Sequence, residues 1–188
     1  FIASVPKEVL VVLDEAYTEY LAEGEGGDSV AWTREFQNLI VSRTFSKAYG
    51  LAGLRVGFAI SNSEVADLVN RVRQPFNVNS LAQAAAVAAL QDEGFLQESR
   101  RVNDEGMQQI TAALTEMGLS FIPSRANFVT FHCDHAAQIN DYLLHHGVIV
   151  RPLAGYRMPN SLRVSIGLAE ENARFITVLR EALQHYAG

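Results

Sequence analysis

The chain has 188 residues, of which 48% are hydrophobic and 19% are charged, so it is long enough to bury a sizeable core in one or two domains. Its formal net charge of −6 argues against a general affinity for nucleic acid or for an anionic membrane surface. No apolar run reaches the length of a membrane span, and the single cysteine excludes an internal disulfide, which favours a cytoplasmic protein.

Three apolar segments in the first half of the chain predict strands of one sheet. Val9–Leu13 is a continuous apolar run closed by Asp14 and Glu15, which is typical of a parallel strand covered on both faces. Leu39–Val41 is a second run of this kind, and Arg55–Ile60 is a third that glycines and polar residues bound. The pattern predicts an α/β fold.

Three helices are predicted after these strands. We expect Ser63 to cap the first, which runs to about Arg73 before Pro75 breaks it. The alanine-rich segment Ser80–Leu90 has helical spacing, and Asp92–Met117 has the pattern of a long helix with polar faces.

Short strands and helices alternate after the long helix, which predicts a second, smaller α/β unit. Because the composition changes around residues 94–105, we divide the chain into residues 1–96 and residues 97–188, the second part including the long helix. The expected strands are Phe128–Phe131, Val148–Val150 and Leu162–Ile166, and the expected helices are about His135–His146 and Glu170–Tyr186.

A polar loop containing a lysine follows the second predicted strand. Lys47 is a primary amine, which attacks a carbonyl carbon when a compact site holds it unprotonated. Hydroxyl groups at Thr44 and Ser46, with the guanidinium of Arg55, would suit a phosphate group, which arginine binds through two hydrogen bonds. Taken alone, this segment is more simply a surface loop with a solvated lysine.

The sequence Asp-Glu-Ala-Tyr follows the first predicted strand. Ligands of open α/β sheets bind beyond the carboxyl ends of the strands. A carboxylate at Asp14 would there pair with a protonated pyridine nitrogen, and Tyr17 would donate its phenol proton to a ring oxygen. Asp14 alone is more simply a turn or helix cap, but the two segments together end neighbouring buried strands.

These two segments, VVLDEAYTEY and SRTFSKAYGLAGLRVG, resemble the fold-type I aminotransferases, and most closely the histidinol-phosphate aminotransferase family. The similarity continues through QPFNVNSLAQAAAVAAL, ANFVTF, GVIVRPLAGY and MPNSLRVSIGLAEEN, in the family's order. It implies the second half of a large cofactor-binding domain, with a mostly parallel sheet and flanking helices, and then a small C-terminal α/β domain. A chain that begins at Phe1 also reads as a piece of a longer protein.

The resemblance implies pyridoxal 5′-phosphate as the cofactor. Lys47 would hold it as a Schiff base and later act as the base that moves a proton between substrate and cofactor. Asp14 would pair with the pyridine nitrogen, and Tyr17 would hydrogen-bond the phenolic oxygen. The phosphate would be held by Thr44, Ser46 and Arg55.

The resemblance also implies substrate-binding residues in the second half of the chain. Arg163 matches an arginine that holds the substrate α-carboxylate, and Arg151 matches one that meets the substrate phosphate. In a chain of net negative charge, converging arginines would provide the field that an anionic substrate needs. The alternative is that both form structural ion pairs with Glu170 or Glu171. Asn127 would orient the substrate, although a turn-forming Asn explains it equally well; Arg157 is a weaker candidate.

The cluster His132–His135 is not expected to bind a metal ion, because its spacing matches no strong zinc pattern. Asp134 is more simply the cap of the next helix, and Cys133 is expected to pack as a small apolar residue.

The implied reaction transfers an amino group from L-histidinol phosphate to 2-oxoglutarate, in histidine biosynthesis, in a homodimer with sites at the subunit interface. Three alternatives keep the cofactor residues: an aminotransferase for aromatic or other amino acids, a threonine-phosphate decarboxylase, and the aminotransferase-like sensing domain of a transcription regulator. Because the implied site needs an upstream half, we expect the 188 residues alone to bind cofactor weakly and to be inactive.

Overall fold

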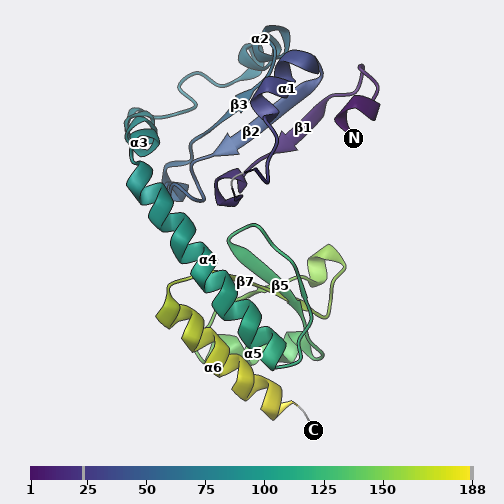
Figure 1. Ribbon diagram of the computed structural model, residues 1–188, viewed down its shortest axis with the longest axis vertical. Coiled ribbons are helices and arrows are strands. Elements are labelled where there is room, and N and C mark those ends of the chain that lie inside the picture. The colour runs from purple at the N-terminus through teal and green to yellow at the C-terminus, as the bar shows by residue number, and fades with distance from the viewer. Residues whose placement is uncertain (23, 187–188) are drawn as a thin grey trace. The chain divides into compact units, whose positions relative to one another are not determined.

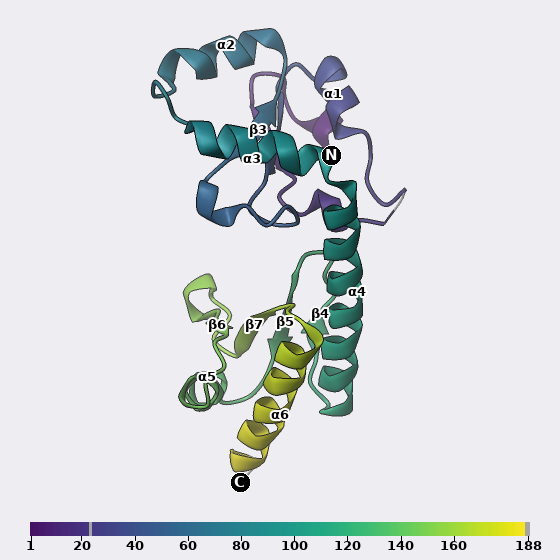
Figure 2. The ribbon, with the colours of Figure 1, turned by 90° about the vertical axis from the view of Figure 1, so that its left-hand side faces the viewer.

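The computed structural model describes residues 1–22 and 24–186 and confirms the predicted α/β class (Figures 1 and 2). The chain divides into two compact units, Phe1–Ser99 (unit 1) and Arg100–Gly188 (unit 2). Unit 1 contains a three-stranded sheet of order β1-β2-β3, and unit 2 contains a four-stranded sheet of order β4-β5-β7-β6.

The sheet of unit 1 is mixed. Strand β1 (Val11–Asp14) runs parallel to β2 (Leu39–Thr44), and β2 runs antiparallel to β3 (Gly57–Ile60). The expectation that the first strand is covered on both faces is wrong for the described residues, because the side chain of Val12 is 62% exposed. Gly57 is required where β3 approaches β2, since a Cβ there would lie 2.7 Å from the carbonyl oxygen of Arg43.

The helices of unit 1 start at polar caps. Asn62, and not the predicted Ser63, caps α2: its side-chain oxygen accepts a hydrogen bond of 2.9 Å from the backbone N–H of Val65. Asp28 and Asn79 cap α1 and α3 in the same way. The helices are α1 (Ser29–Glu35), which was not predicted, α2 (Ser63–Val72) and α3 (Ser80–Gln91). A further helix, α4 (Glu93–Glu116), confirms the predicted long helix.

The sheet of unit 2 is entirely antiparallel. Helices α4, α5 (Ala136–His145) and α6 (Ala169–His185) pack with one face of it around a single core, which includes Phe131 and Leu162. The strands are β4 (Phe121–Ile122), β5 (Phe128–His132), β6 (Arg151–Pro152) and β7 (Ser161–Ser165). Side chains at alternate positions of β5 and β7 therefore form a second, more polar face.

Two predictions about the connection around α5 are wrong. Val148–Val150 is not a strand, because the backbone N–H of Val148 donates to the carbonyl oxygen of Leu143 and completes the end of the helix; strand β6 starts only at Arg151. The residue at the cap position of α5 is His135 in a left-handed conformation, not Asp134, and its side chain makes no capping hydrogen bond.

Cys133 is buried, as predicted. Burial raises the pKa of its thiol to about 11, and the negative charge of Asp134 acts in the same direction. Among the described residues, no helix is both long and apolar enough to cross a membrane.

Candidate functional site

The carboxyl ends of β1 and β2 lie at the same edge of the sheet because the two strands are parallel neighbours. Asp14, the last residue of β1, lies opposite Ser42, whose hydroxyl oxygen is 3.5 Å from the Asp14 carboxylate. The backbone N–H of Ala16 donates to the same carboxylate oxygen over 3.2 Å. These contacts hold the Asp14 carboxylate where the chain turns away from the sheet.

The loop after β2 carries Lys47 and is closed by its own backbone. Leu51 donates to the carbonyl oxygen of Phe45, and Gly50 donates to that of Lys47, both over 2.9 Å. Gly50 has a φ of 71°, a conformation that favours glycine. Lys47 is half-buried, and its ammonium nitrogen lies 5.3 Å from the centre of the Tyr17 ring. The structure thus brings the two predicted segments together.

The three candidate phosphate-binding residues gather at the same loop. The Thr44 hydroxyl accepts a hydrogen bond of 3.1 Å from the backbone N–H of Ser46. The guanidinium of Arg55 lies 3.4 Å from the Ser46 hydroxyl oxygen and donates to the carbonyl oxygen of Ala52 over 2.8 Å. Arg55 is exposed, and its φ of 55° is uncommon for a residue with a side chain. Two hydroxyls and a guanidinium are donors that suit a phosphate.

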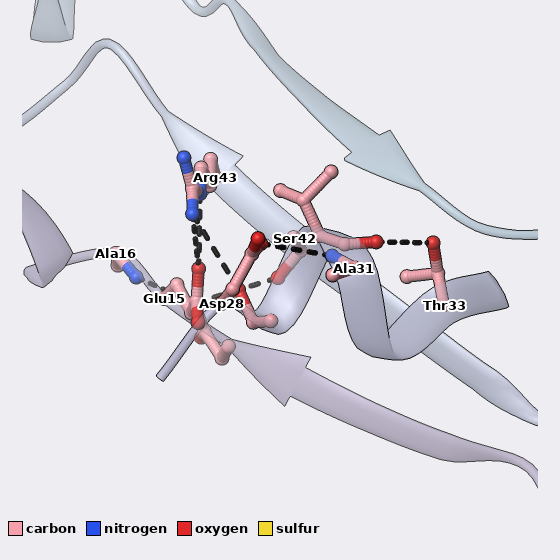
Figure 3. Close-up of polar contacts among 10 residues, drawn as sticks. Glu15, Ala16, Asp28, Ala31, Thr33, Ser42 and Arg43 are labelled. Atoms are coloured by element: carbon pink, nitrogen blue, oxygen red, sulfur yellow. Dashed lines mark hydrogen bonds and ion pairs between the residues drawn. The ribbon is translucent and has the colours of Figure 1, made fainter. Parts of the chain in front are cut away.

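Sequence reasoning missed an ion pair between Glu15 and Arg43, the residues that directly follow Asp14 and Ser42 in the chain (Figure 3). The carboxylate of Glu15 accepts a hydrogen bond of 2.9 Å from Nε of Arg43, and a terminal nitrogen of the same guanidinium lies 2.8 Å from the same carboxylate oxygen in an ion pair. Arg43 also lies 3.5 Å from the hydroxyl oxygen of Ser29 in α1. Glu15 follows Asp14 and Arg43 follows Ser42 in the sequence, but only the parallel pairing of Asp14 with Ser42 in the structure places the opposite charges side by side.

The phenol of Tyr20 lies in the short helix η2 (Thr18–Tyr20) that follows Tyr17. Burial raises its pKa, and the nearby negative charge of Glu19 adds to this, while a hydrogen bond with Ser99 opposes it. The Tyr20 phenol is therefore neutral at physiological pH, and sequence reasoning did not single it out.

In unit 2, the two predicted substrate arginines lie directly opposite each other. Arg151 of β6 and Arg163 of β7 are partners in the antiparallel register. The guanidinium of Arg163 lies 4.6 Å from the centre of the Phe128 ring, on the neighbouring strand β5. Like charges at facing positions of a sheet repel each other, so an anion bound between them would remove an unfavourable term.

The expected alternative, an ion pair with Glu170 or Glu171, is wrong for the described residues. Neither Arg151 nor Arg163 forms an ion pair with a described residue. The Glu171 carboxylate instead accepts a hydrogen bond of 2.8 Å from the backbone N–H of Leu168. This leaves both guanidinium groups available to an anionic ligand.

Asn127 and Arg157 have less defined surroundings. The carbonyl oxygen of Asn127 accepts a hydrogen bond of 2.9 Å from the backbone N–H of Ile166, just before β5 begins, whereas its side chain makes none with the described residues. Arg157 is exposed, with a φ of 62°, after the short helix η4 (Ala154–Tyr156). The candidate cofactor residues thus all belong to unit 1, and the candidate substrate residues all belong to unit 2.

Comparison with known proteins decides the family. Residues 2–179 match the family described as aminotransferase class I and II. The chain belongs to this family. It is 61% identical over 184 residues to histidinol-phosphate aminotransferase of Methylobacillus flagellatus, and 58% identical over 186 residues to histidinol-phosphate aminotransferase 2 of Pseudomonas aeruginosa. Each alignment covers 98% of the chain but only 50% of the relative, so the chain spans about half the length of these curated relatives.

Solved structures of an aminotransferase and of a decarboxylase show the same fold. Histidinol-phosphate aminotransferase from Sinorhizobium meliloti, crystallised with pyridoxal-5′-phosphate, superimposes with a TM-score of 0.89 at 32% identity, covering 97% of this chain and 51% of that one. L-threonine-O-3-phosphate decarboxylase from Porphyromonas gingivalis superimposes with a TM-score of 0.81 at 26% identity, covering 95% and 56%. This class I and II aminotransferase chain therefore has fold-type I architecture.

Proposed function

We propose that the chain is the C-terminal half of a pyridoxal-phosphate-dependent aminotransferase that transfers the amino group of L-histidinol phosphate to 2-oxoglutarate. The observation that carries the proposal is the facing pair Arg151 and Arg163, two guanidinium groups without an ion pair among the described residues. The high identity to relatives named histidinol-phosphate aminotransferase supports the choice of substrate.

The residues of unit 1 fit the cofactor by their chemistry. A guanidinium and a hydroxyl 3.4 Å apart, at Arg55 and Ser46, provide donors for its phosphate, with Thr44 beside them. The Asp14 carboxylate is an acceptor for a protonated ring nitrogen, and Tyr17 supplies a phenol for the ring oxygen. When bound, pyridoxal phosphate supplies an electron sink that stabilises negative charge at the substrate Cα.

Lys47 provides the amine in this proposal. Its side-chain nitrogen, half-buried and 5.3 Å from the centre of the Tyr17 ring, would hold the cofactor and, as the free amine, move a proton at the substrate Cα. Tyr17 limits where the lysine side chain can lie, so it helps to direct the amine. Because Lys47 and Tyr17 have different roles, substituting each residue alone can distinguish them.

Unit 2 recognises the substrate in this proposal. L-Histidinol phosphate carries a phosphate group, and 2-oxoglutarate carries carboxylates, so both half-reactions bring an anion to the guanidinium pair. Arg163 is the primary anchor because Phe128 holds its guanidinium in place, and Arg151 contributes the second charge. Asn127, whose side chain is not engaged by the described residues, orients the substrate beside them.

The domain division, assembly and location follow from the same proposal. Residues 1–96 form the second half of the cofactor-binding large domain, and residues 97–188 form the small domain with the connecting helix. The full-length enzyme is a homodimer in the cytoplasm, where its role in histidine biosynthesis places it. The family relationship and the buried, unpaired Cys133 support these proposals.

The decisive experiment is a coupled assay of the full-length enzyme with L-histidinol phosphate and with phenylalanine as amino donors. We expect turnover of histidinol phosphate, and we expect Lys47→Ala to abolish it, because Lys47 supplies the amine in this proposal. Retained transamination by Lys47→Ala would falsify the proposed role. Release of carbon dioxide from a phosphorylated amino acid would identify a decarboxylase instead.

The same assay tests the substrate. Arg151→Ala is expected to raise KM for histidinol phosphate by about 10-fold or more, since a hydrogen bond to a charged group is lost, without a similar effect on phenylalanine. Arg180→Ala is the matched control, because Arg180 is an exposed arginine of the same unit that pairs with Glu116 and is no candidate for substrate binding. Equal sensitivity of both variants, or a preference for phenylalanine, would favour an aromatic aminotransferase.

A further inference from the structure

The Glu15–Arg43 ion pair lies on the opposite face of the unit 1 sheet from Asp14 and Ser42. Side chains alternate along a strand, and the backbone N–H of Glu15 still donates to the carbonyl oxygen of Ser42, so the parallel ladder continues to this point. The pair therefore lies behind the carboxylate assigned to the cofactor, on the face of the sheet where the Ser29 hydroxyl of α1 lies 3.5 Å from Arg43.

The pair is more enclosed than the surface ion pair between Asp67 and Arg71 in α2. The side chain of Glu15 is 14% exposed and that of Arg43 is 28% exposed, whereas the exposures are 55% for Asp67 and 68% for Arg71 in the surface pair of α2. Charges withdrawn from water need a partner with good geometry, and the Glu15 carboxylate meets the Arg43 guanidinium through one hydrogen bond of 2.9 Å and a second nitrogen at 2.8 Å. A pair of this kind is a specific link between two strand ends.

Stability alone does not account for such a link. Well-packed apolar residues of similar size often stabilise a protein as much as a buried ion pair does, or more. What charges add is fixed distance and direction, because hydrogen bonds to a charged group are short and oriented. The link joins Glu15, between Asp14 and Tyr17, to Arg43, between Ser42 and Thr44.

We propose that Glu15 and Arg43 form a positioning pair, which sets Asp14 and Tyr17 relative to the loop of Lys47 and thereby sets affinity and orientation of the cofactor. This inference rests on the proposed function, because it needs pyridoxal phosphate at this site. Neither residue touches the cofactor in the proposal; both act through the residues beside them in the chain.

The test is a titration of the full-length apoenzyme with pyridoxal phosphate, followed by visible absorbance and by the induced circular dichroism of the bound cofactor. Glu15→Gln keeps the size of the side chain and removes its charge. We expect the dissociation constant to rise about 10-fold, the lower end of the range for residues that orient a ligand's direct partners, and the induced dichroism per bound cofactor to fall.

Exchange of the two charges separates positioning from loss of a single side chain. The double variant Glu15→Arg with Arg43→Glu restores an ion pair, and its affinity is expected to recover partly relative to Glu15→Arg alone. Asp67→Asn is the matched control, since it removes the carboxylate that pairs with the exposed Arg71 in the same unit. It is expected to leave the affinity for the cofactor and the induced dichroism unchanged.

Three outcomes overturn the inference. The first is a Glu15→Gln enzyme with wild-type affinity and dichroism, even if its melting temperature falls. The second is an exchange variant no better than Glu15→Arg. If Glu15→Gln does not fold, Glu15→Asp replaces it, because it keeps the charge on a shorter side chain. Wild-type affinity and dichroism from that variant are the third outcome. A wild-type apoenzyme that binds no pyridoxal phosphate instead overturns the proposed function.

Discussion

Unit 2 buries a continuous apolar core, whereas unit 1 buries a small one and exposes much of its apolar surface. The buried core of unit 2 joins the sheet to α4, α5 and α6 and includes Ile110, Leu114, Leu143 and Leu179, all 0% exposed. The corresponding buried cluster of unit 1 around α3 consists of Phe45, Val56, Ala82 and Ala86.

Helix α2 shows the difference most clearly. Its apolar residues repeat on one side, yet none of its residues is buried: Leu68 and Val69 are each 53% exposed, and Val72 is 82% exposed. Extended apolar surfaces on folded proteins usually contact another protein surface. The comparison therefore supports the proposal that unit 1 is part of a larger domain, and it assigns most of the stability of the 188-residue chain to unit 2.

The largest expected effect comes from truncating matched leucines in the two units. Leu179 in α6 is 0% exposed and Leu81 in α3 is 75% exposed. Leu179→Ala is expected to lower the free energy of unfolding by about 2–5 kcal/mol, through lost apolar burial and the cavity left behind. Leu81→Ala is expected to change it by less than about 0.5 kcal/mol. Urea unfolding of the chain, followed by circular dichroism, measures both.

Equal losses from the two leucine variants would contradict this contrast. That result would mean that α3 is covered in solution, for example by a second copy of the chain. Dependence of the unfolding midpoint of Leu81→Ala on protein concentration would then identify self-association.

A smaller loss of stability is expected at Gly106, where side chains of unit 2 pack directly against the backbone of α4. A Cβ added at Gly106 in α4 would lie 2.5 Å from a methyl carbon of Ile166 and 2.7 Å from the side-chain nitrogen of Asn172. Gly106→Ala should therefore destabilise the chain by about 1–3 kcal/mol, although alanine normally favours a helix. Gly155→Ala is the control, since no atom lies within 4 Å of its added Cβ; a stabilised Gly106→Ala would show that the packing is loose.

Local patterns predicted most elements because they depend on nearby residues. The long helix α4 and strands β2, β5 and β7 were found from their apolar spacing. The apolar run Val148–Val150 misled for a physical reason: Ile149 is 83% exposed, and the run completes the end of α5 instead of pairing in the sheet. Helix α1 was missed because its seven residues are too few for a clear period.

Sequence motifs predicted individual residues of the site but not which of them lie together. The motifs named Lys47 and Asp14, but the pairing of distant residues depends on strand register, which a single sequence does not reveal. Glu15 meets Arg43 only through the parallel alignment of β1 with β2. Arg151 faces Arg163 only through the antiparallel alignment of β6 with β7, whereas the sequence pattern placed Arg151 just after an expected strand, Val148–Val150.

The smallest expected effect separates the roles of the two units within the full-length enzyme. Phe128 lies in the same unit as Arg163 and supports its guanidinium at 4.6 Å, a contact worth a modest free energy at a half-exposed site. Phe128→Leu removes the aromatic face and is expected to raise KM for histidinol phosphate roughly two- to fivefold, with little change in kcat. Phe128→Tyr keeps the face and should restore KM. Neither variant should alter the affinity for pyridoxal phosphate, because that affinity depends on unit 1; a joint change in KM and cofactor affinity would show that the two sets of residues do not act separately.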